Sequence, residues 1–505
     1  DWTQAGLIFV PDNEFQAPAV MELAAGEAGT KLHFTGVLDV NTAYTAVLTG
    51  LDDYQITAGG KISATGETSL THEMTVVKKT FYPVSGSLLH LPAEANVTSL
   101  AFTEVKADGN QGQSYPARVQ PAADGSGQTY AVSLRDGVYQ ASMTTADGLY
   151  ETSTHVTVVG SETERDLYVT FTGTPAAIPF EADLYVGYPA RSGYGTIGEA
   201  MEAAGAMRLT DPETRITVHI YPGVYREQVT VDVPNITFVN DLPEQGDVII
   251  TWYYGIGYEY YSVGEDGFYD PARAYDKYKK AEPASWGGTV RLTENAGGFQ
   301  AKKITFENSF NDYVTEEELA DGVGLSHSGQ SDIDFERTLG ADVRSREATE
   351  RAAAMLIYAD KTEFFDCEFL SSQDTLYTHE GTEGYFKNCR IEGNTDYIFG
   401  YGDYYFDACT LSFCGYSDEP SGGYITAARE PKSAGGGYLF DSCRIVRNTE
   451  NGMLHEPGYF GRPWGEVLNV TFVDSILETA DVIAAEGWHE MSGRQPDGQY
   501  CHEYG

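Results

Sequence analysis

The sequence predicts an all-β protein in which a right-handed parallel β-helix follows one or two small β-sandwich domains. Three observations support this prediction: the length of 505 residues, short alternating strands in the first third, and a repeat of about twenty residues in the last third. A chain of this length exceeds one ordinary globular core, so two or three domains are expected. The 55 Gly and 35 Tyr residues favour β-structure with many turns.

The first third is expected to form two β-sandwich modules, at residues 1–80 and 81–177. Apolar and polar residues alternate over segments such as 31–35 and 154–159, as in strands with one buried face. The second module resembles the transthyretin-like sandwiches that are appended to secreted bacterial enzymes, especially in its turn at Asp136-Gly-Val-Tyr. Neither module contains a cluster of catalytic residue types, so a spacer or a carbohydrate contact is expected of both.

Residues 178–505 are expected to form the β-helix. A helical stretch at 196–207 would cover one end of it, and short strands follow. The motif Cys-x-apolar then recurs at intervals of 22, 20 and 34 residues. About twenty residues suit one coil of three short strands, and successive coils stack about 4.8 Å apart. The repeated cysteines would then form a buried ladder of free thiols: Cys367, Cys389, Cys409 and Cys443.

Two long insertions, at 251–280 and 311–350, interrupt the coils. The first contains eight Tyr residues, and the second is acidic and mixed. Loops of this length in a compact fold are often functional. The aromatic insertion would either wall a sugar-binding cleft or pack on itself without a ligand.

The charge excludes several classes of partner. The formal net charge is −43, from 75 acidic and 32 basic residues, and such a surface repels nucleic acid and anionic membranes.

No apolar run approaches the roughly 18 residues that a membrane span needs. No Cys/His cluster has the spacing of a zinc site, and no metal is expected. The chain begins at Asp1 without an initiator Met or a signal peptide, which we interpret as the mature or trimmed form of a longer product. We separately expect a secreted, extracellular protein that is a monomer.

Two aspartates repeat at the same interval as two cysteines of the ladder. Asp374 lies seven residues after Cys367, and Asp396 lies seven after Cys389. The two carboxylates would therefore stack on adjacent coils within about 5 Å. Like charges that close raise one pKa, which leaves one neutral acid and one carboxylate. Spacing alone leaves two interpretations open: an acid and nucleophile pair, or a ladder that caps turns or binds a cation.

Four segments lie in an order and at spacings typical of one enzyme family. They are Gly223-Val-Tyr-Arg-Glu, Ser372-Gln-Asp-Thr-Leu-Tyr, Asp396-Tyr-Ile-Phe-Gly and Phe460-Gly-Arg-Pro-Trp. All four resemble signature segments of the pectin methylesterase family, and the resemblance covers about residues 180–490. It implies a hydrolase without a cofactor that acts on the methyl esters of pectin, releases methanol and leaves acidic pectin.

The resemblance also implies roles for individual residues. Asp396 would be the nucleophile, and Asp374 the general acid and then the base. Arg462 would hydrogen-bond Asp396 and keep it ionised, and Gln373 would donate to the oxyanion. Three aromatic residues would contact the sugar chain: Trp464, Tyr377 and Phe399.

One position departs from the family pattern. Where the family has Gln in a Gln-Ala-Val-Ala-Leu segment, this chain has Arg351-Ala-Ala-Ala-Met-Leu, one coil before Gln373. Arg351 could donate to the oxyanion, bind a neighbouring carboxylate of the sugar chain, or pair with Glu347 or Glu350. Losing one oxyanion donor lowers the turnover rate by a factor of about 10²–10³. The catalytic efficiency therefore depends on which of these three partners Arg351 has.

Other functions remain possible from the sequence. Stacked carboxylates also suit a glycosidase, and a β-helix can carry a polysaccharide lyase, which would need calcium and a basic group. A pectin-binding protein with little or no catalysis is a further alternative because of Arg351. A serine esterase is disfavoured, since no Gly-x-Ser-x-Gly segment is present.

Overall fold

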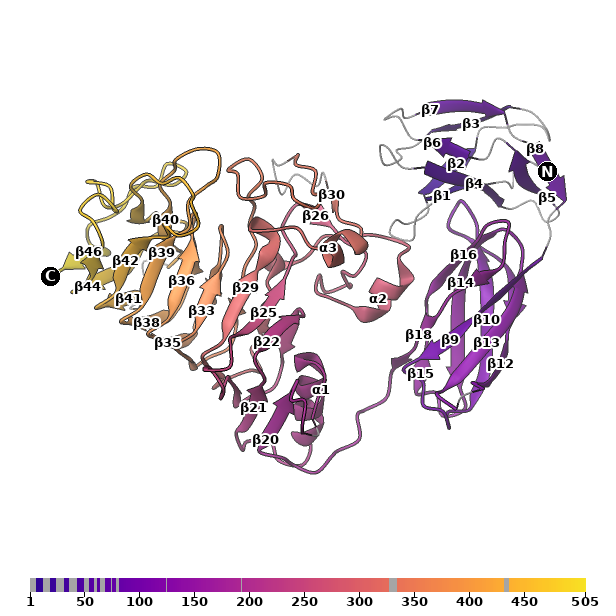
Figure 1. The fold of residues 1–505 in the computed structure, drawn as a ribbon, viewed down its shortest axis with the longest axis horizontal. Coiled ribbons are helices and arrows are strands. Elements are labelled where there is room, and N and C mark those ends of the chain that lie inside the picture. The colour runs from indigo at the N-terminus through magenta and orange to yellow at the C-terminus, as the bar shows by residue number, and fades with distance from the viewer. Residues whose placement is uncertain are drawn as a thin grey trace. The chain divides into compact units, whose positions relative to one another are not determined.

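The structure is a computed structural model. It describes the strand paths at 6–11, 19–23, 31–35, 43–49, 54–58, 61–63, 69–73 and 75–78, and then residues 81–123, 125–191, 193–326, 334–430 and 436–505. Over these residues the chain consists mainly of strands, with few and short helices (Figure 1). The chain divides into two compact units. One comprises Asp1–Thr174, Tyr260–Ala281 and Ala320–Gly322, and the other comprises Pro175–Glu259, Glu282–Leu319 and Val323–Gly505.

The first unit begins with a six-stranded antiparallel sheet and a two-stranded one. In sheet order the six strands are β6 (Lys61–Ser63), β4 (Ala43–Thr49), β1 (Gly6–Pro11), β2 (Ala19–Leu23), β3 (Lys31–Thr35) and β7 (Ser69–Glu73). The two-stranded sheet pairs β5 (Tyr54–Ala58) with β8 (Thr75–Lys78). The expected module boundary at residue 80 falls between β8 and the next strand, and the division into two modules stays a prediction.

The rest of the first unit has a four-stranded and a five-stranded sheet around one apolar core, which includes Phe102, Tyr130 and Val156. The first sheet contains β11 (Gln111–Pro116), β10 (Val97–Val105), β14 (Gly137–Thr145) and β16 (His155–Val158). The second contains β12 (Arg118–Pro121), β13 (Gln128–Leu134), β9 (Tyr82–Leu89) and β17 (Thr163–Glu164), with β18 (Leu167–Tyr168) also on β9. A short pair joins β15 (Tyr150–Glu151) and β19 (Thr170–Phe171).

The second unit is a parallel β-helix, as predicted. Three parallel sheets run along it, and the chain visits each sheet once per coil. The ten-stranded sheet contains β20 (Asp183–Val186), β21 (Ile216–Ile220), β24 (Ile236–Val239), β28 (Gln300–Lys302), β32 (Thr362–Phe365), β35 (Glu383–Lys387), β38 (Asp403–Asp407), β41 (Tyr438–Asp441), β44 (Val470–Val473) and β46 (Cys501–Tyr504).

The other two sheets follow in each coil. The eight-stranded sheet contains β22 (Gly223–Arg226), β25 (Val248–Trp252), β29 (Thr305–Asn308), β33 (Glu368–Leu370), β36 (Arg390–Gly393), β39 (Thr410–Phe413), β42 (Arg444–Arg447) and β45 (Ile476–Leu477). The seven-stranded sheet contains β23 (Val229–Val231), β27 (Val290–Leu292), β31 (Met355–Ile357), β34 (Leu376–Thr378), β37 (Ile398–Gly400), β40 (Tyr424–Ala428) and β43 (Tyr459–Gly461). Outside these sheets, β26 (Tyr258–Glu259) pairs with β30 (Gly324–Leu325).

The expected helix is α1 (Ile197–Met207), and its sequence explains where it begins. The Thr196 hydroxyl accepts from the N–H of Glu199, and the Glu199 carboxylate accepts from the Thr196 N–H, which is a capping box. Its buried residues, including Ile197 and Ala204, join the core of the β-helix. The other helical segments are α2 (Pro271–Asp276), η2 (Ser285–Gly287), η3 (Ser309–Asn311) and α3 (Glu316–Ala320). No helix in the described part of the chain is long and apolar enough to cross a membrane.

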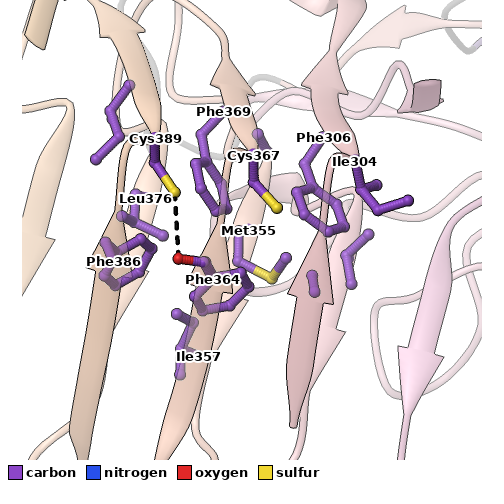
Figure 2. Close-up of a cluster of buried hydrophobic side chains, with 14 of the residues drawn as sticks. Ile304, Phe306, Met355, Ile357, Phe364, Cys367, Phe369, Leu376, Phe386 and Cys389 are labelled. Atoms are coloured by element: carbon purple, nitrogen blue, oxygen red, sulfur yellow. Dashed lines mark hydrogen bonds between the residues drawn. The ribbon is translucent and has the colours of Figure 1, made fainter. Parts of the chain in front are cut away.

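The interior of the β-helix is built from ladders of like residues (Figure 2). All four cysteines of the predicted ladder are buried, and all six cysteines of the chain are free thiols. The Cys389 thiol lies 3.5 Å from the Phe364 carbonyl oxygen, which accepts its weak hydrogen bond. A second ladder consists of stacked phenylalanine rings whose centroids are 4.4–4.8 Å apart, close to the strand spacing. Its members are Phe364, Phe386, Phe406, Phe440 and Phe472.

The aromatic insertion packs on itself and on the first unit. Tyr254, Tyr258, Tyr260 and Tyr261 are each at most 1% exposed, so these rings are core residues. Residues Tyr260–Ala281 belong to the first compact unit, where the Asp276 carboxylate accepts from the backbone N–H of His155 at 2.8 Å. The interpretation of this insertion as the wall of a sugar cleft is therefore wrong for its buried tyrosines.

The phenylalanine ladder predicts a stability effect. Phe386 is fully buried between two rings, so Phe386→Ala should lower the free energy of unfolding by about 3–5 kcal/mol. Lys387 is the next residue of the same strand, and its side chain is 45% exposed in an ion pair with Asp407. Lys387→Ala should therefore cost at most about 1 kcal/mol. Chemical denaturation measures both, and equal losses would contradict the packing described here.

Candidate active site

Two adjacent coils bring the two predicted aspartates together. Strands β34 and β37 pair in parallel, and the residues before them continue the pairing, since Gln373 is bridged to Thr395. The same offset of 22 residues places Asp374 and Asp396 at equivalent positions on adjacent coils. Both have a left-handed backbone, with φ of 58° and 52°, a conformation that short polar side chains tolerate better than most.

Arg462 distinguishes the two carboxylates. It follows β43 two coils after Asp396, and its Nε donates to Asp396 Oδ1 at 2.8 Å while Nη2 donates to Oδ2 at 2.7 Å. This fork is a charge-assisted bidentate pair. The guanidinium also lies over the Tyr424 ring, 4.1 Å from its centroid. Asp374 makes no such pair with Arg462, so the two aspartates are inequivalent although the backbone repeats.

Burial and neighbouring charge raise the pKa of both carboxyl groups. Asp374 is 7% exposed and Asp396 is 6% exposed. For Asp374, burial and then the Asp396 charge raise the pKa well above 3.8. For Asp396, burial raises the pKa, but the hydrogen bonds and charge of Arg462 oppose that effect. The pair therefore favours a protonated Asp374 beside an ionised Asp396.

The residues predicted to contact the oxyanion lie on successive coils. Arg351 is bridged in parallel to Gln373, which places the guanidine-bearing residue one coil earlier, as the spacing indicated. The Arg351 Nε donates to Glu350 Oε1 at 2.8 Å. Of the partners considered for Arg351, the structure therefore shows Glu350. Gln373 itself is half-buried beside the aspartates.

Aromatic side chains gather on the same strands. Tyr377 and Phe399 lie opposite one another in β34 and β37, three residues after the respective aspartates. Trp464 lies two residues after Arg462, and its ring centroid is 6.0 Å from that of Phe399. Tyr377 and Phe399 are buried, whereas Trp464 is half-buried. All three aromatic residues that the sequence pointed to are thus brought together.

Trp286 completes this cluster and was missed from the sequence. Its ring stacks on Tyr377 with centroids 4.7 Å apart and planes at 26°, and it meets Phe399 edge to face at 5.0 Å. It also meets Trp464 at 6.2 Å. Trp286 has φ of 62° within η2, outside the repeat, so periodicity carried no signal for it. We call Trp286, Tyr377, Phe399 and Trp464 the aromatic cluster.

Other candidate features lie apart from the aspartates. A cavity of about 220 Å³ is lined by Ser371 and Ser372 but by neither aspartate. Glu227, within the upstream signature segment, accepts from the N–H groups of Ile197 and Gly198 at 3.0 Å, so it caps α1. In the described ranges, no group of three or more His, Cys, Asp or Glu side chains is arranged to hold a metal ion.

Comparison with known proteins points to one family. The family model described as Pectinesterase matches residues 321–505, which include both aspartates and Arg462. Probable pectinesterase A of Aspergillus niger is 27% identical over 303 residues, covering 59% of this chain and 71% of that protein. Pectinesterase 31 of Arabidopsis thaliana is 27% identical over 300 residues, covering 57% and 73%.

Solved structures are also similar to part of this chain. The pectin methylesterase of Aspergillus niger is 25% identical and aligns with a TM-score of 0.44, covering 66% of this chain and 87% of that one. Pectin methylesterase PemA of Erwinia chrysanthemi is 20% identical with a TM-score of 0.47, covering 65% and 89%. The family model and the curated relatives therefore make this chain similar to pectinesterases, which supports a carboxylic ester hydrolase.

Proposed function

We propose that this protein hydrolyses the methyl esters of pectin, releasing methanol and leaving acidic pectin. The observation that carries the proposal is the asymmetric aspartate pair: two buried carboxyl groups on adjacent coils, of which only Asp396 is held by Arg462. An ionised carboxylate beside a neutral carboxylic acid supplies a nucleophile and a proton donor at the same ester. The match of residues 321–505 to the Pectinesterase family model supports the choice of substrate.

In the first half of the reaction, a carboxylate oxygen of Asp396 attacks the carbonyl carbon of the methyl ester. The C–O bond to the methoxy group then breaks, and Asp374 gives its proton to the departing oxygen, so that methanol leaves. The product of this half is an acyl anhydride between Asp396 and the sugar carboxyl group. Arg462 keeps Asp396 ionised and fixes its orientation for the attack.

In the second half, the now ionised Asp374 takes a proton from water, and the resulting hydroxide attacks the anhydride carbonyl. The bond to Asp396 breaks, which returns Asp396 as a carboxylate and Asp374 as an acid. The Gln373 amide and the Arg351 guanidinium are the proposed donors to the oxyanion that forms in each half. The half-buried rings of the aromatic cluster, Trp286 and Trp464, are the proposed contacts for the sugar rings, with Tyr377 and Phe399 packed against them.

The charge of the protein fits this reaction. The substrate ester is neutral, whereas each turnover creates one carboxylate, which a protein of net charge −43 repels. The surface therefore favours release of demethylated stretches. We propose that the protein works outside the cell as a monomer, without a cofactor, on pectin and not on nucleic acid.

The nucleophile is tested by methanol release from highly methyl-esterified pectin. Asp396→Asn should reduce the rate at least about a thousandfold, because an amide cannot form the anhydride. Asp366→Asn is the matched control, since Asp366 is exposed, has the same left-handed backbone, and is followed one coil later by Asn388. The control should keep wild-type activity. Reducing ends or unsaturated sugars without methanol would contradict the esterase function.

The protonated state of Asp374 is tested by stability. A carboxyl group whose pKa is raised in the folded state stabilises that state at low pH, and this contribution is lost as the pH rises from about 4 through the folded pKa. Asn mimics the neutral acid without titrating. Asp374→Asn should therefore gain unfolding free energy relative to wild type as pH rises above about 4, by up to about 1.4 kcal/mol per pH unit. A pH-independent difference between Asp374→Asn and wild type would contradict the raised pKa.

The role of Trp286 is tested by kinetics. Removing a ring from the aromatic cluster should weaken sugar binding, so Trp286→Ala should raise KM for pectin about tenfold. Trp286→Phe keeps a ring in place and should recover most of the affinity. If neither variant changes KM while both unfold at lower temperature, Trp286 serves the packing alone.

A further inference from the structure

The pair formed by Glu350 and Arg351 lies one coil before Gln373 and is built into the fold. The Asn311 side chain holds Glu350 at both backbone groups, since Nδ2 donates to the Glu350 carbonyl at 2.7 Å and Oδ1 accepts from the Glu350 N–H at 3.0 Å. Glu350 is 7% exposed and Asn311 is 4% exposed. Buried contacts therefore fix the Glu350 backbone, from which its carboxylate extends.

The Glu350 carboxylate holds Arg351 at two points. Its Oε1 accepts from both the backbone N–H and the Nε of Arg351, each at 2.8 Å. The Arg351 side chain is 28% exposed and the Glu350 side chain is 8% exposed, so this ion pair is shielded from water on the acid side. An ion pair between neighbours in the sequence, with one oxygen serving two donors, fixes the direction in which the guanidinium leaves the backbone.

We infer that Glu350 is a positioning residue for the proposed reaction: it directs the Arg351 guanidinium and compensates its charge, so that a cation can lie one coil before Gln373 while Asp374 keeps its proton. The expected effect on the rate of methanol release rests on the proposed function, whereas the expected effect on the pKa of Asp374 does not. In related enzymes the position of Arg351 carries a neutral glutamine, as the family resemblance implies. A Glu–Arg pair has the same net charge as that glutamine, and it adds a stronger hydrogen-bond donor.

Four charged groups act on Asp374. Asp396, on the following coil, and Glu350 raise its pKa, whereas Arg351 and Arg462 lower it. Arg462 is already paired with Asp396, so those two charges largely offset each other. Glu350 and Arg351 form the second compensated pair. An uncompensated Arg351 would favour the ionised form of Asp374, and the departing methoxy group would then lack its proton donor.

The experiment measures kcat for methanol release against pH, with an enzyme-free blank, in four variants. Activity needs protonated Asp374, so the rate falls as pH rises through its pKa. Glu350→Gln removes the Glu350 charge from Arg351 and should move this fall to lower pH by about one unit. Arg351→Gln leaves Glu350 uncompensated and should move it to higher pH by a similar amount. In the double variant Glu350→Gln/Arg351→Gln the pH of this fall should return close to its wild-type position, as it should in Arg351→Lys, which keeps the cation, whatever the loss in the rate itself.

The controls come from a solvent-exposed pair of the same type. Arg346 donates to Glu419 at 2.6 Å, with side chains that are 60% and 51% exposed. Arg346→Gln and Glu419→Gln should leave the pH profile unchanged. Shifts of the Glu350 and Arg351 variants in the same direction, or a double variant no closer to wild type than the single ones, would overturn the inference, because a purely structural role produces no opposed shifts.

A second measurement separates this inference from the proposed function. In each background, the unfolding free energy of the protein is compared with that of its Asp374→Asn partner across pH, which reports the pKa of Asp374 without any substrate. Opposed shifts of that pKa in Glu350→Gln and Arg351→Gln support the compensation even if no methanol is released, in which case the proposed function alone fails. Unchanged pKa values in a protein that does release methanol overturn the compensation alone.

Discussion

The parallel pairing of each coil with the next is the constraint on which the rest of this structure depends. Strands in register repeat every 4.8 Å or so, and residues about 22 positions apart become neighbours. A slip of one residue would turn every inward side chain outward. The buried thiols, the phenylalanine stack and the aspartate pair therefore all depend on the same register between coils, and a change of register would disrupt all three.

A repeating backbone gives residues at the same position of successive coils similar surroundings. Acid–base chemistry instead needs two carboxyl groups whose surroundings differ. Asp374 and Asp396 have the same backbone conformation, similar burial and the same offset. Arg462 removes the symmetry because it enters from a third coil and bonds only one of the two. The asymmetry between the two carboxyl groups thus comes from a single cation placed outside their repeat.

The features that could be predicted from the sequence are mainly those that follow the coil repeat. The cysteine intervals gave the coil length, the coil length placed Asp374 beside Asp396, and α1 was readable from its periodicity and its cap. Trp286 was not predictable, because it reaches the aromatic cluster from a turn with a left-handed backbone outside the repeat. The aromatic insertion was ambiguous because composition does not say whether tyrosines face a ligand or a core. Glu350 stood among several acidic neighbours, and only its buried contact with Asn311 distinguishes it.

The insertion Tyr260–Ala281 bears on whether this chain can be divided. The polypeptide leaves the β-helical unit, contributes to the other unit and returns, so the boundary between the units is crossed more than once. Asp276 is 8% exposed because residues such as His155, far away in the sequence, cover it. A truncation that began at Pro175 would strip this cover and leave a buried carboxylate and its aromatic neighbours facing solvent. An expression boundary at Pro175 would therefore cut through the first compact unit, because Tyr260–Ala281 belong to it.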